Sequence, residues 1–200
     1  MAVRQAGVSL HFTSLPGPYG IGEIGRHARA FTDRLRDMNL TVWQFLPTGP
    51  TAYGDSPYQP LSTFAGNEML IDIGELIDNG FLSDEEASEL TTLPERFVDY
   101  GALIPVKSRL LELAATRFPE TASPEVETFY GRFLAKLDKK WLHDYALFRI
   151  LKARFDERPW PEWPAEYVHR DGDALRQLEQ SARLEIERIK IMQCLFHYQW

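Results

Sequence analysis

The sequence has only one cysteine, Cys194, so it cannot form an internal disulfide bond. Such sparse cysteine usage is typical of proteins in a reducing compartment, and we expect a cytoplasmic location. No apolar run approaches the ~20 residues needed to span a bilayer, and the first residues lack the apolar core of a signal peptide. Clusters of Lys and Arg are also absent, and the formal net charge is −7. We therefore expect neither a membrane nor a nucleic acid as a partner.

Histidines are also few and isolated. They are His11, His27, His143, His169 and His197. None has a neighbouring His, Cys or acid at metal-ligand spacing, so we expect no metal site. His11 lies near the carboxyl end of the first predicted strand, where it could serve a site or simply pack in the core. What the chain does have, 44% apolar and 26% charged residues, is typical of a folded globular protein.

Residues 7–46 have the pattern of a strand, a helix and a second strand. Apolar and polar residues alternate from Val8 to Thr13, which predicts a strand. Apolar residues then recur at helical spacing until Asn39, a residue suited to a left-handed helix cap. Residues 41–46 are mostly apolar with β-branched and aromatic members, which predicts a parallel strand buried on both faces.

The loops after the two strands leave their carboxyl ends, and this edge carries the functional site in parallel α/β architectures. The second loop contains Tyr53-Gly54-Asp55-Ser56-Pro57-Tyr58-Gln59. Its Gly and Pro keep it out of helix and sheet, and it presents aromatic rings beside hydrogen-bonding groups. A pyranose ring stacks on aromatic faces, while its hydroxyls need donors and acceptors nearby. Two interpretations stay open: a sugar-binding loop, or a tyrosine-rich loop that covers the edge of a core.

The first loop contains Gly20-Ile21-Gly22-Glu23-Ile24-Gly25, which matches the dinucleotide-binding pattern G-x-G-x-x-G between a strand and a helix. Three features weaken that interpretation. The segment Leu15–Tyr19 separates the strand from the first glycine, where the motif needs a tight turn. Glu23 would face the pyrophosphate with a like charge, and no acid ends the second strand to bind a ribose. We favour a glycine-rich turn that lets the backbone approach a ligand or another loop closely.

The chain changes character near residue 76, and we expect residues 76–165 to form a helical block after the second strand. Ser83, followed by three acids, is typical of a helix start. Prolines near a first helical position predict helices over Pro105–Phe118 and Pro124–Lys139. The Trp-rich and Pro-rich segment Pro159–Pro164 breaks regular structure; it could form a sugar platform or, as we favour, a rigid packed corner.

The last part of the chain predicts one long helix. From Asp173 to Trp200, apolar residues recur every three or four positions. The pattern stops at Trp200 without a Gly, Asn or Pro that would end a helix. We therefore expect the chain to be a fragment of a longer protein.

Several segments form a recognisable set in a fixed order along nearly the whole chain: Gly7–Gly17, Tyr19–Gly22, Trp43–Pro50, Tyr53–Gln59, Ser62–Asn67, Val98–Tyr100, Trp141–Phe148 and Gln199–Trp200. This set resembles the 4-α-glucanotransferases, also called amylomaltases or disproportionating enzymes. One departure is Thr48, where the family commonly has Leu, and we interpret it as a packing change.

The resemblance implies an α/β fold: the N-terminal part of a (β/α)8 TIM barrel, with its first two strands and a large α-helical insertion. It also implies three parts of the chain. Residues 1–75 would start the catalytic barrel and carry the substrate-binding loops. Residues 76–165 would be the helical insertion, and residues 166–200 the long helix that returns to the barrel.

The resemblance further implies retaining transfer of α-1,4-glucan segments without a cofactor. The partners would be maltooligosaccharides, α-1,4-glucans derived from starch or glycogen, and glucose. The family's catalytic carboxyl groups would lie after Trp200, so no residue of this chain receives a catalytic role. An α-glucan hydrolase on the same barrel and a non-catalytic glucan-binding piece stay open as alternatives.

Four residues of the second loop are implied to bind the substrate. Tyr58 would stack on or hydrogen-bond the sugar at the cleavage point, with Ser56 beside it. Tyr53 would offer a second stacking face to a more distant glucose. Asp55 could accept hydrogen bonds from sugar hydroxyls or hold the loop through backbone N–H groups.

Overall fold

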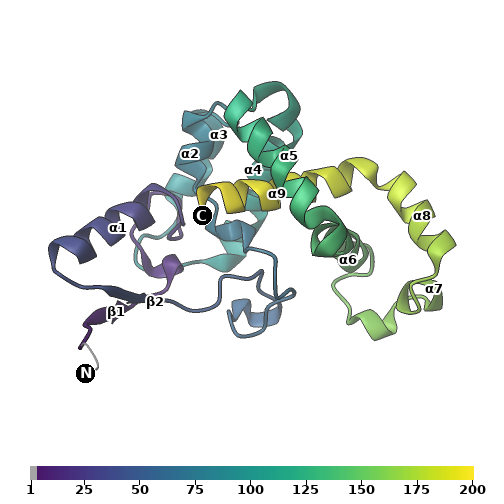
Figure 1. Ribbon diagram of the computed structural model, residues 1–200, viewed down its shortest axis with the longest axis horizontal. Helices are drawn as coiled ribbons and strands as arrows, with labels where there is room; N and C mark the ends of the chain where they lie inside the picture. Colours follow the sequence, from purple (N-terminus) through teal and green to yellow (C-terminus); the bar gives the residue numbers. More distant parts are fainter. Residues whose placement is uncertain (1–3) are drawn as a thin grey trace.

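A computed structural model describes residues 4–200, apart from the side chain of Tyr53, and Figure 1 shows the arrangement of its elements. In chain order the strands and α-helices are β1 (Gly7–Ser9), α1 (Arg26–Asp37), β2 (Val42–Gln44), α2 (Ile73–Asp78), α3 (Asp84–Ala87), α4 (Tyr100–Thr121), α5 (Pro124–Leu137), α6 (His143–Arg154), α7 (Ala165–Val168), α8 (Gly172–Ser181) and α9 (Arg183–Gln199). Between them lie short 3-10 turns at Phe12–Ser14, Tyr53–Asp55, Glu68–Leu70, Ser88–Thr92 and Trp160–Glu162, and a π-helical turn at Asp138–Leu142.

The first part of the chain forms the predicted strand–helix–strand unit. β1 and β2 pair in parallel, with Val8 opposite Trp43, and α1 connects them. Asn39 follows the helix in the left-handed conformation, with φ of 57°, as predicted. The indole ring of Trp43 packs against Phe31 of α1 with ring centroids 4.9 Å apart, so α1 covers one face of the sheet. In Figure 1 this unit lies at the left, beside the helical part.

Both strands are shorter than predicted, and the second is not buried on both faces. The alternation that starts at Val8 produces a strand only as far as Ser9, and the chain then enters the 3-10 turn Phe12–Ser14. Val42 and Phe45 are exposed, so the prediction of a fully buried second strand is wrong. A parallel strand is buried when other strands and layers surround it. Within residues 4–200 the sheet has two strands, and each has an open edge.

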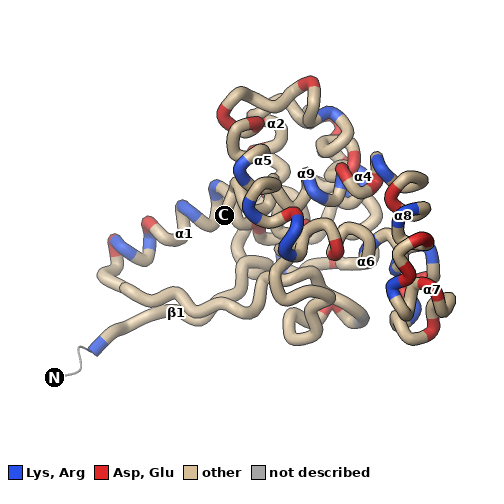
Figure 2. The backbone as a smooth tube through the Cα atoms, turned by 45° about the vertical axis from the view of Figure 1, so that its right-hand side comes forward, with Lys and Arg blue, Asp and Glu red and all other residues tan. Residues whose placement is uncertain are grey.

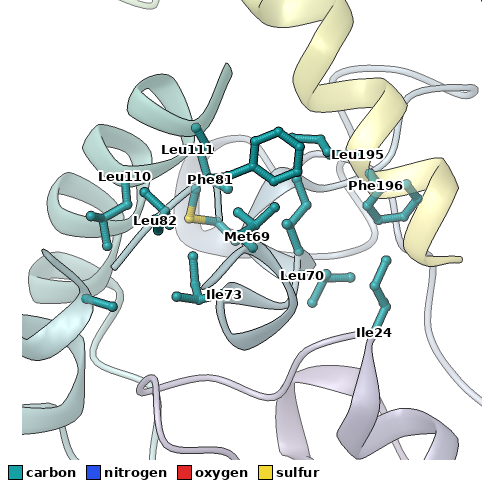
Figure 3. Packing of buried hydrophobic residues seen from close by; sticks show 14 of the residues in the cluster. Ile24, Met69, Leu70, Ile73, Phe81, Leu82, Leu110, Leu111, Leu195 and Phe196 are labelled. Atoms are coloured by element: carbon teal, nitrogen blue, oxygen red, sulfur yellow. The ribbon is translucent and has the colours of Figure 1, made fainter. Parts of the chain in front are cut away.

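α9 is the central helix of the molecule and packs against α4, α5 and α6 (Figure 1). The main hydrophobic core lies where α4 and α9 meet the segments around α2 (Figure 3). Its members include Ile24, Met69, Leu70, Ile73, Phe81, Leu82, Leu110, Leu111, Leu195 and Phe196. This core contains residues from the strand–helix–strand unit as well as from the helices, so the two parts share one interior. The division of the chain at residues 75 and 165 stays a prediction.

Two helix starts agree with the sequence signals. The Ser83 hydroxyl accepts a hydrogen bond from the N–H of Glu86 at 3.2 Å, and the Glu86 carboxylate accepts one from the N–H of Ser83 at 2.9 Å. This reciprocal capping box begins α3. α5 begins at Pro124, as predicted, after the capping residue Ser123.

α4 begins earlier than predicted. The proline pattern predicts a start at Pro105, but the helix starts at Tyr100. The physical reason is the cap, because Oδ1 of Asp99 accepts a hydrogen bond from the N–H of Ala102 at 3.1 Å. Pro105 therefore lies inside the helix, and the prediction that it starts the helix is wrong.

The predicted long helix over residues 173–200 is interrupted at Ala182, which has φ of −113° and ψ of 21°. The prediction of one continuous helix is therefore wrong, and α8 and α9 are separate. The break turns α8 toward α7, and Leu178 packs there in a second core with Leu147 and Trp163. The apolar spacing could not reveal the break, because both helices keep the same repeat.

The Trp-rich segment before α7 forms a packed corner. Trp163 is buried between Phe148 and Phe155, with ring centroids 5.7 and 5.8 Å away. Its indole N–H donates a hydrogen bond to the carbonyl of Arg158 at 3.2 Å. The indole of Trp160 is exposed on the outside of this corner.

A buried ion pair connects the glycine-rich turn after β1 to α4. Glu23 and Lys107 are 1% and 0% exposed, and the Lys107 ammonium donates a hydrogen bond to the Glu23 carboxylate. The N–H of Ile73 also donates to Oε1 of Glu23 at 3.3 Å. Burial raises the pKa of Glu23 to about 7, although Lys107 opposes that shift, and burial lowers the pKa of Lys107. Each charge therefore depends on the other for its stabilisation.

Replacement of Lys107 alone should damage the fold more than replacement of both partners. Lys107→Met leaves the Glu23 carboxylate buried without its counter-charge, and we expect the free energy of unfolding to fall by about 3–5 kcal/mol. The double variant Glu23→Gln/Lys107→Met removes both charges of this pair and should recover most of that loss. Urea unfolding followed by circular dichroism measures both values. Equal losses in the single and double variants would contradict the ion-pair account.

Candidate functional site

The loop between β2 and α2 forms a narrow two-legged structure, and we call residues 48–67 the arm. The main-chain N–H of Asn67 donates a hydrogen bond to the carbonyl of Thr48 at 2.8 Å and closes the base of the arm. Further out, the N–H of Leu61 donates to the carbonyl of Pro50, also at 2.8 Å. These bonds hold the two legs side by side and leave the residues between them as a tip.

Backbone conformation sets the shape of the tip, residues 52–59. Gly54 and Asp55 both adopt the left-handed conformation, with φ of 77° and 52°, within a 3-10 turn. Ser56 is extended, with φ of −76° and ψ of 124°, as expected for a residue that precedes proline. Its hydroxyl accepts a hydrogen bond from the N–H of Tyr58 at 3.4 Å. Ser56 and Tyr58 are thus held beside each other.

The structure divides the predicted site residues between two surfaces. Tyr58 is 70% exposed, so its ring is accessible to a ligand. Asp55 is half-buried and lines a groove of about 660 Å³ between the tip and the helices, together with Arg149 of α6. Burial and the nearby Asp55 carboxylate raise the pKa of Tyr100, at the start of α4. The side chain of Tyr53 lies outside the part of the chain that the structure describes, so its role stays a prediction.

The arm carries almost no charge. Between Asp37 and Glu68, Asp55 is the single residue among Asp, Glu, Lys and Arg. Figure 2 shows this stretch of the tube as almost entirely tan, whereas the helices carry charges along much of their length. A neutral surface with an exposed ring, a hydroxyl and amide groups suits an uncharged polyhydroxyl ligand such as a sugar.

A second aromatic surface on the arm was not predicted. Phe64 is exposed, and its ring is stacked on that of Trp141 with centroids 6.2 Å apart and an interplanar angle of 28°. Trp141 belongs to the π-helical turn Asp138–Leu142, a type of irregularity that is frequent at functional sites. The pattern of the sequence could not pair these rings, because they lie far apart along the chain and neither has a local signal for the other.

The glycine-rich turn contacts the chain itself. A β-carbon on Gly22 would lie 2.0 Å from the carbonyl oxygen of Phe12, and one on Gly25 would lie 2.2 Å from Oδ2 of Asp72. A pyrophosphate would bind at the N-terminus of α1, but there Oδ2 of Asp72 accepts a hydrogen bond from the N–H of Arg26 at 2.8 Å. A carboxylate of the chain therefore occupies the anion position, and the glycines permit the close approach of one loop to another.

A metal site, a site at His11 and a reactive cysteine have less support in the structure than a binding site on the arm. Within residues 4–200, no three His, Cys, Asp or Glu side chains gather where they could hold a metal ion. His11 is half-buried, and burial lowers its pKa. Cys194 is buried, which raises the pKa of its thiol to about 12 and makes it unreactive. No helix in this described part is long and apolar enough to cross a membrane.

Comparison of the sequence with known proteins identifies its relatives. The profile of a family described as 4-alpha-glucanotransferase matches residues 10–200. A 4-alpha-glucanotransferase of Thermus thermophilus is 42% identical over 197 residues, which are 98% of this chain and 38% of that protein. A 4-alpha-glucanotransferase of Streptococcus pneumoniae is 38% identical over 205 residues, which are 100% of this chain and 39% of that protein.

Comparison of the structure gives a matching result. An amylomaltase from Streptococcus agalactiae, solved in complex with acarbose, is 34% identical and superposes with a TM-score of 0.89. The match covers 99% of this chain and 40% of the other. The chain thus spans about two fifths of the length of the relatives that it matches. The resemblance inferred from the sequence motifs is confirmed.

Gly54 and Gly131 allow a matched test of the backbone conformation in the tip. A β-carbon on either glycine would meet nothing within 4 Å, but Gly54 has a positive φ, whereas Gly131 lies inside α5. Gly54→Ala should destabilise the protein by about 1–2 kcal/mol, because an L-residue is strained in the left-handed region. Gly131→Ala should stabilise it by about 0.5–1 kcal/mol, because alanine loses less entropy in a helix. Thermal unfolding measures both changes, and an unaltered stability of Gly54→Ala would contradict the strained turn.

Proposed function

Because this chain belongs to the 4-alpha-glucanotransferase family, we propose that the full-length protein transfers α-1,4-glucan segments between maltooligosaccharides. The donors would be maltodextrins derived from starch or glycogen, and the acceptors would be shorter glucans or glucose. The observation that carries the proposal is the neutral arm at the carboxyl end of β2, with the ring of Tyr58 exposed at its tip. Such a ring beside hydroxyl and amide groups suits a glucan chain.

In this proposal, β1, α1 and β2 form the first strand–helix–strand repeat of a (β/α)8 barrel. The parallel pairing of β1 with β2, connected through α1, supports this assignment. The position of the arm directly after β2 supports it as well, because barrel enzymes bind their substrates at the carboxyl ends of the strands. Residues 76–165 would be a helical insertion that forms a wall of the substrate cleft.

Each residue of the tip would have a separate role. Tyr58 would stack on the glucose ring at the cleavage point, and its exposure and the rigid approach through Pro57 support that role. Since the Ser56 oxygen accepts a bond from the Tyr58 N–H, its hydroxyl hydrogen is free to be donated to a sugar oxygen. Asp55 would accept hydrogen bonds from sugar hydroxyls in the groove or hold the tip against α4. Tyr53 would offer a stacking face to a more distant glucose.

The chemical step needs groups that the arm does not contain. Retaining transfer requires two carboxyl groups about 5–5.5 Å apart, one as nucleophile and one as acid/base. Asp55 has no second acid near it on the arm, and we assign neither role to a residue of this chain. In the proposal, both carboxyl groups come from the part of the family's sequence that these 200 residues do not span.

The proposed sequence of events follows from those two carboxyl groups. The acid protonates the leaving glucan while the nucleophile forms a glycosyl ester. A sugar hydroxyl of the acceptor then attacks the ester in place of water, the former acid takes the proton of that hydroxyl, and the bond to the nucleophile breaks to release its carboxylate. The arm would hold the donor sugar during both steps. The helical wall would limit the access of bulk water to the ester, which favours transfer over hydrolysis.

The products formed from maltotriose test the proposed reaction. The full-length protein should convert maltotriose into glucose and oligosaccharides longer than maltotriose, which chromatography separates. Longer products arise only when a glucan segment is passed to another glucan. If maltotriose is only shortened, the protein is an α-glucan hydrolase and the proposal of transfer is wrong.

Tyr58→Ala tests the arm as the binding element. The variant should lower kcat/KM for maltotriose by an amount equivalent to about 0.5–1.5 kcal/mol, in addition to the loss of buried area, because the stacked ring is removed. The melting temperature should change little, since the side chain is 70% exposed. Tyr58→Phe is the matched control, because it keeps the ring and should keep most of the activity. Unchanged kinetics in Tyr58→Ala would refute the role of the ring.

A further inference from the structure

Two glutamines of α9 bind the main chain of a distant segment in the same way. Gln193 accepts a hydrogen bond from the Gly66 N–H at 2.8 Å and donates one to the Gly66 carbonyl at 2.9 Å. Gln199 accepts one from the Asp72 N–H at 2.7 Å and donates one to the Asp72 carbonyl at 3.1 Å. Each side-chain amide therefore satisfies both polar groups of one residue. The glutamines are 1% and 9% exposed, and unpaired amides at such positions would be costly.

The two pairs have the same chemistry but hold different parts of the molecule. Gly66 belongs to the arm and lies at its base. Asp72 lies beyond the arm and caps the N-terminus of α2, where its Oδ1 accepts a hydrogen bond from the N–H of Glu75 at 2.9 Å. Gln193 thus acts on the arm, whereas Gln199 acts on the start of a helix.

The base of the arm is held from two directions. Asn67 follows Gly66 directly, and its N–H donates to the carbonyl of Thr48, so a fixed Gly66 also fixes the other leg. The ring of Phe196 fills the space beside Gly66, since a β-carbon there would lie 2.1 Å from a ring carbon. Gln193 and Phe196 are three positions apart on α9 and so lie on neighbouring turns of one face. The base of the arm therefore packs on this face of α9.

We propose that Gln193 is a positioning residue for glucan binding, because it holds the base of the arm so that Tyr58 meets the sugar. The inference rests on the proposed function, since it takes Tyr58 as the ring that contacts the glucan. Gln193 is buried and acts only through Gly66 and the legs of the arm. An arm without this bond samples more positions, and binding must then order it. The expected effect is therefore on KM more than on kcat.

Gln193→Met and Gln199→Met form a matched pair for the test. Methionine is an unbranched side chain that can fill the space of the glutamine but has no amide. Gln193→Met leaves both the N–H and the carbonyl of Gly66 unpaired. Gln199→Met leaves the N–H of Asp72 unpaired, whereas the Asp72 carbonyl still accepts a hydrogen bond from the N–H of Leu76 at 3.3 Å. Both variants should therefore lose thermal stability, and the loss in Gln199→Met should be no larger than in Gln193→Met. In the full-length protein, only Gln193→Met should raise the KM for maltotriose, by up to about tenfold, which corresponds to the loss of one stacking contact. The same KM in both variants would overturn the proposal.

Hydrogen exchange provides a readout that does not depend on catalysis. Gln193→Met should speed amide exchange in residues 48–61 of the arm, whereas Gln199→Met should leave exchange there unchanged. Equal exchange in the arms of the two variants would refute the role of Gln193, whatever the enzyme activity. If the unsubstituted protein does not disproportionate maltotriose, the proposed function fails, and with it the role in glucan binding. Faster exchange in the arm of Gln193→Met would then show only that Gln193 holds the base of the arm.

Gly66→Ala disturbs the same junction between the arm and α9 through Phe196, and it serves if Gln193→Met does not fold. The added β-carbon must push the base of the arm away from Phe196, because 2.1 Å is far shorter than any contact between non-bonded carbon atoms. This variant should raise the KM for maltotriose and speed exchange in the arm, as Gln193→Met does. Unchanged KM and unchanged exchange in Gly66→Ala would overturn the proposal.

Discussion

Two glutamines of α9 hold the main chain of residues 66–72, and one of them, Gln193, holds the base of the arm that carries the candidate site. This segment joins the arm to α2, and it forms no strand ladder that could satisfy its polar groups. Gln193 and Gln199 supply the missing partners from a helix that also packs against α4, α5 and α6. Without these amides, buried N–H and carbonyl groups would be unpaired in the middle of the core. α9 therefore connects the helical part, the arm and the strand–helix–strand unit.

The same principle applies to two buried carboxylates, Asp72 and Glu23. Asp72 accepts hydrogen bonds from the N–H groups of Arg26 and Glu75, and so caps α1 and α2 at once. Glu23 is paired with Lys107 in the same region. Gly25 is needed because the carboxylate of Asp72 leaves no space for a β-carbon. A glycine pattern that resembles a phosphate-binding loop is therefore explained by the binding of the chain's own carboxylate at the helix N-terminus.

Comparison of the predicted helix ends with those in the structure shows what a single sequence can predict. Asn39, Ser83 and Pro124 mark the helix ends and starts that were predicted, because each acts on backbone groups within a few residues of itself. Pro105 misled the prediction of α4, because a proline is also tolerated a short distance inside a helix whose cap lies upstream. The bend at Ala182 was missed, because the apolar repeat is the same on both sides and only the direction of packing differs.

Sequence motifs and local patterns were enough to predict the family, the strand–helix–strand unit and a neutral, tyrosine-bearing loop after the second strand. These features depend on side-chain type and on spacing within a short segment. The packing of the whole chain sets three features that these patterns do not predict: Tyr58 faces outward, Asp55 lines a groove, and Gln193 holds Gly66. The reason is that all residues except proline have the same backbone N–H and carbonyl. The local pattern therefore cannot specify which residue a buried side-chain amide will bind. The partner is chosen when packing places one residue of a distant segment beside it and excludes water from both.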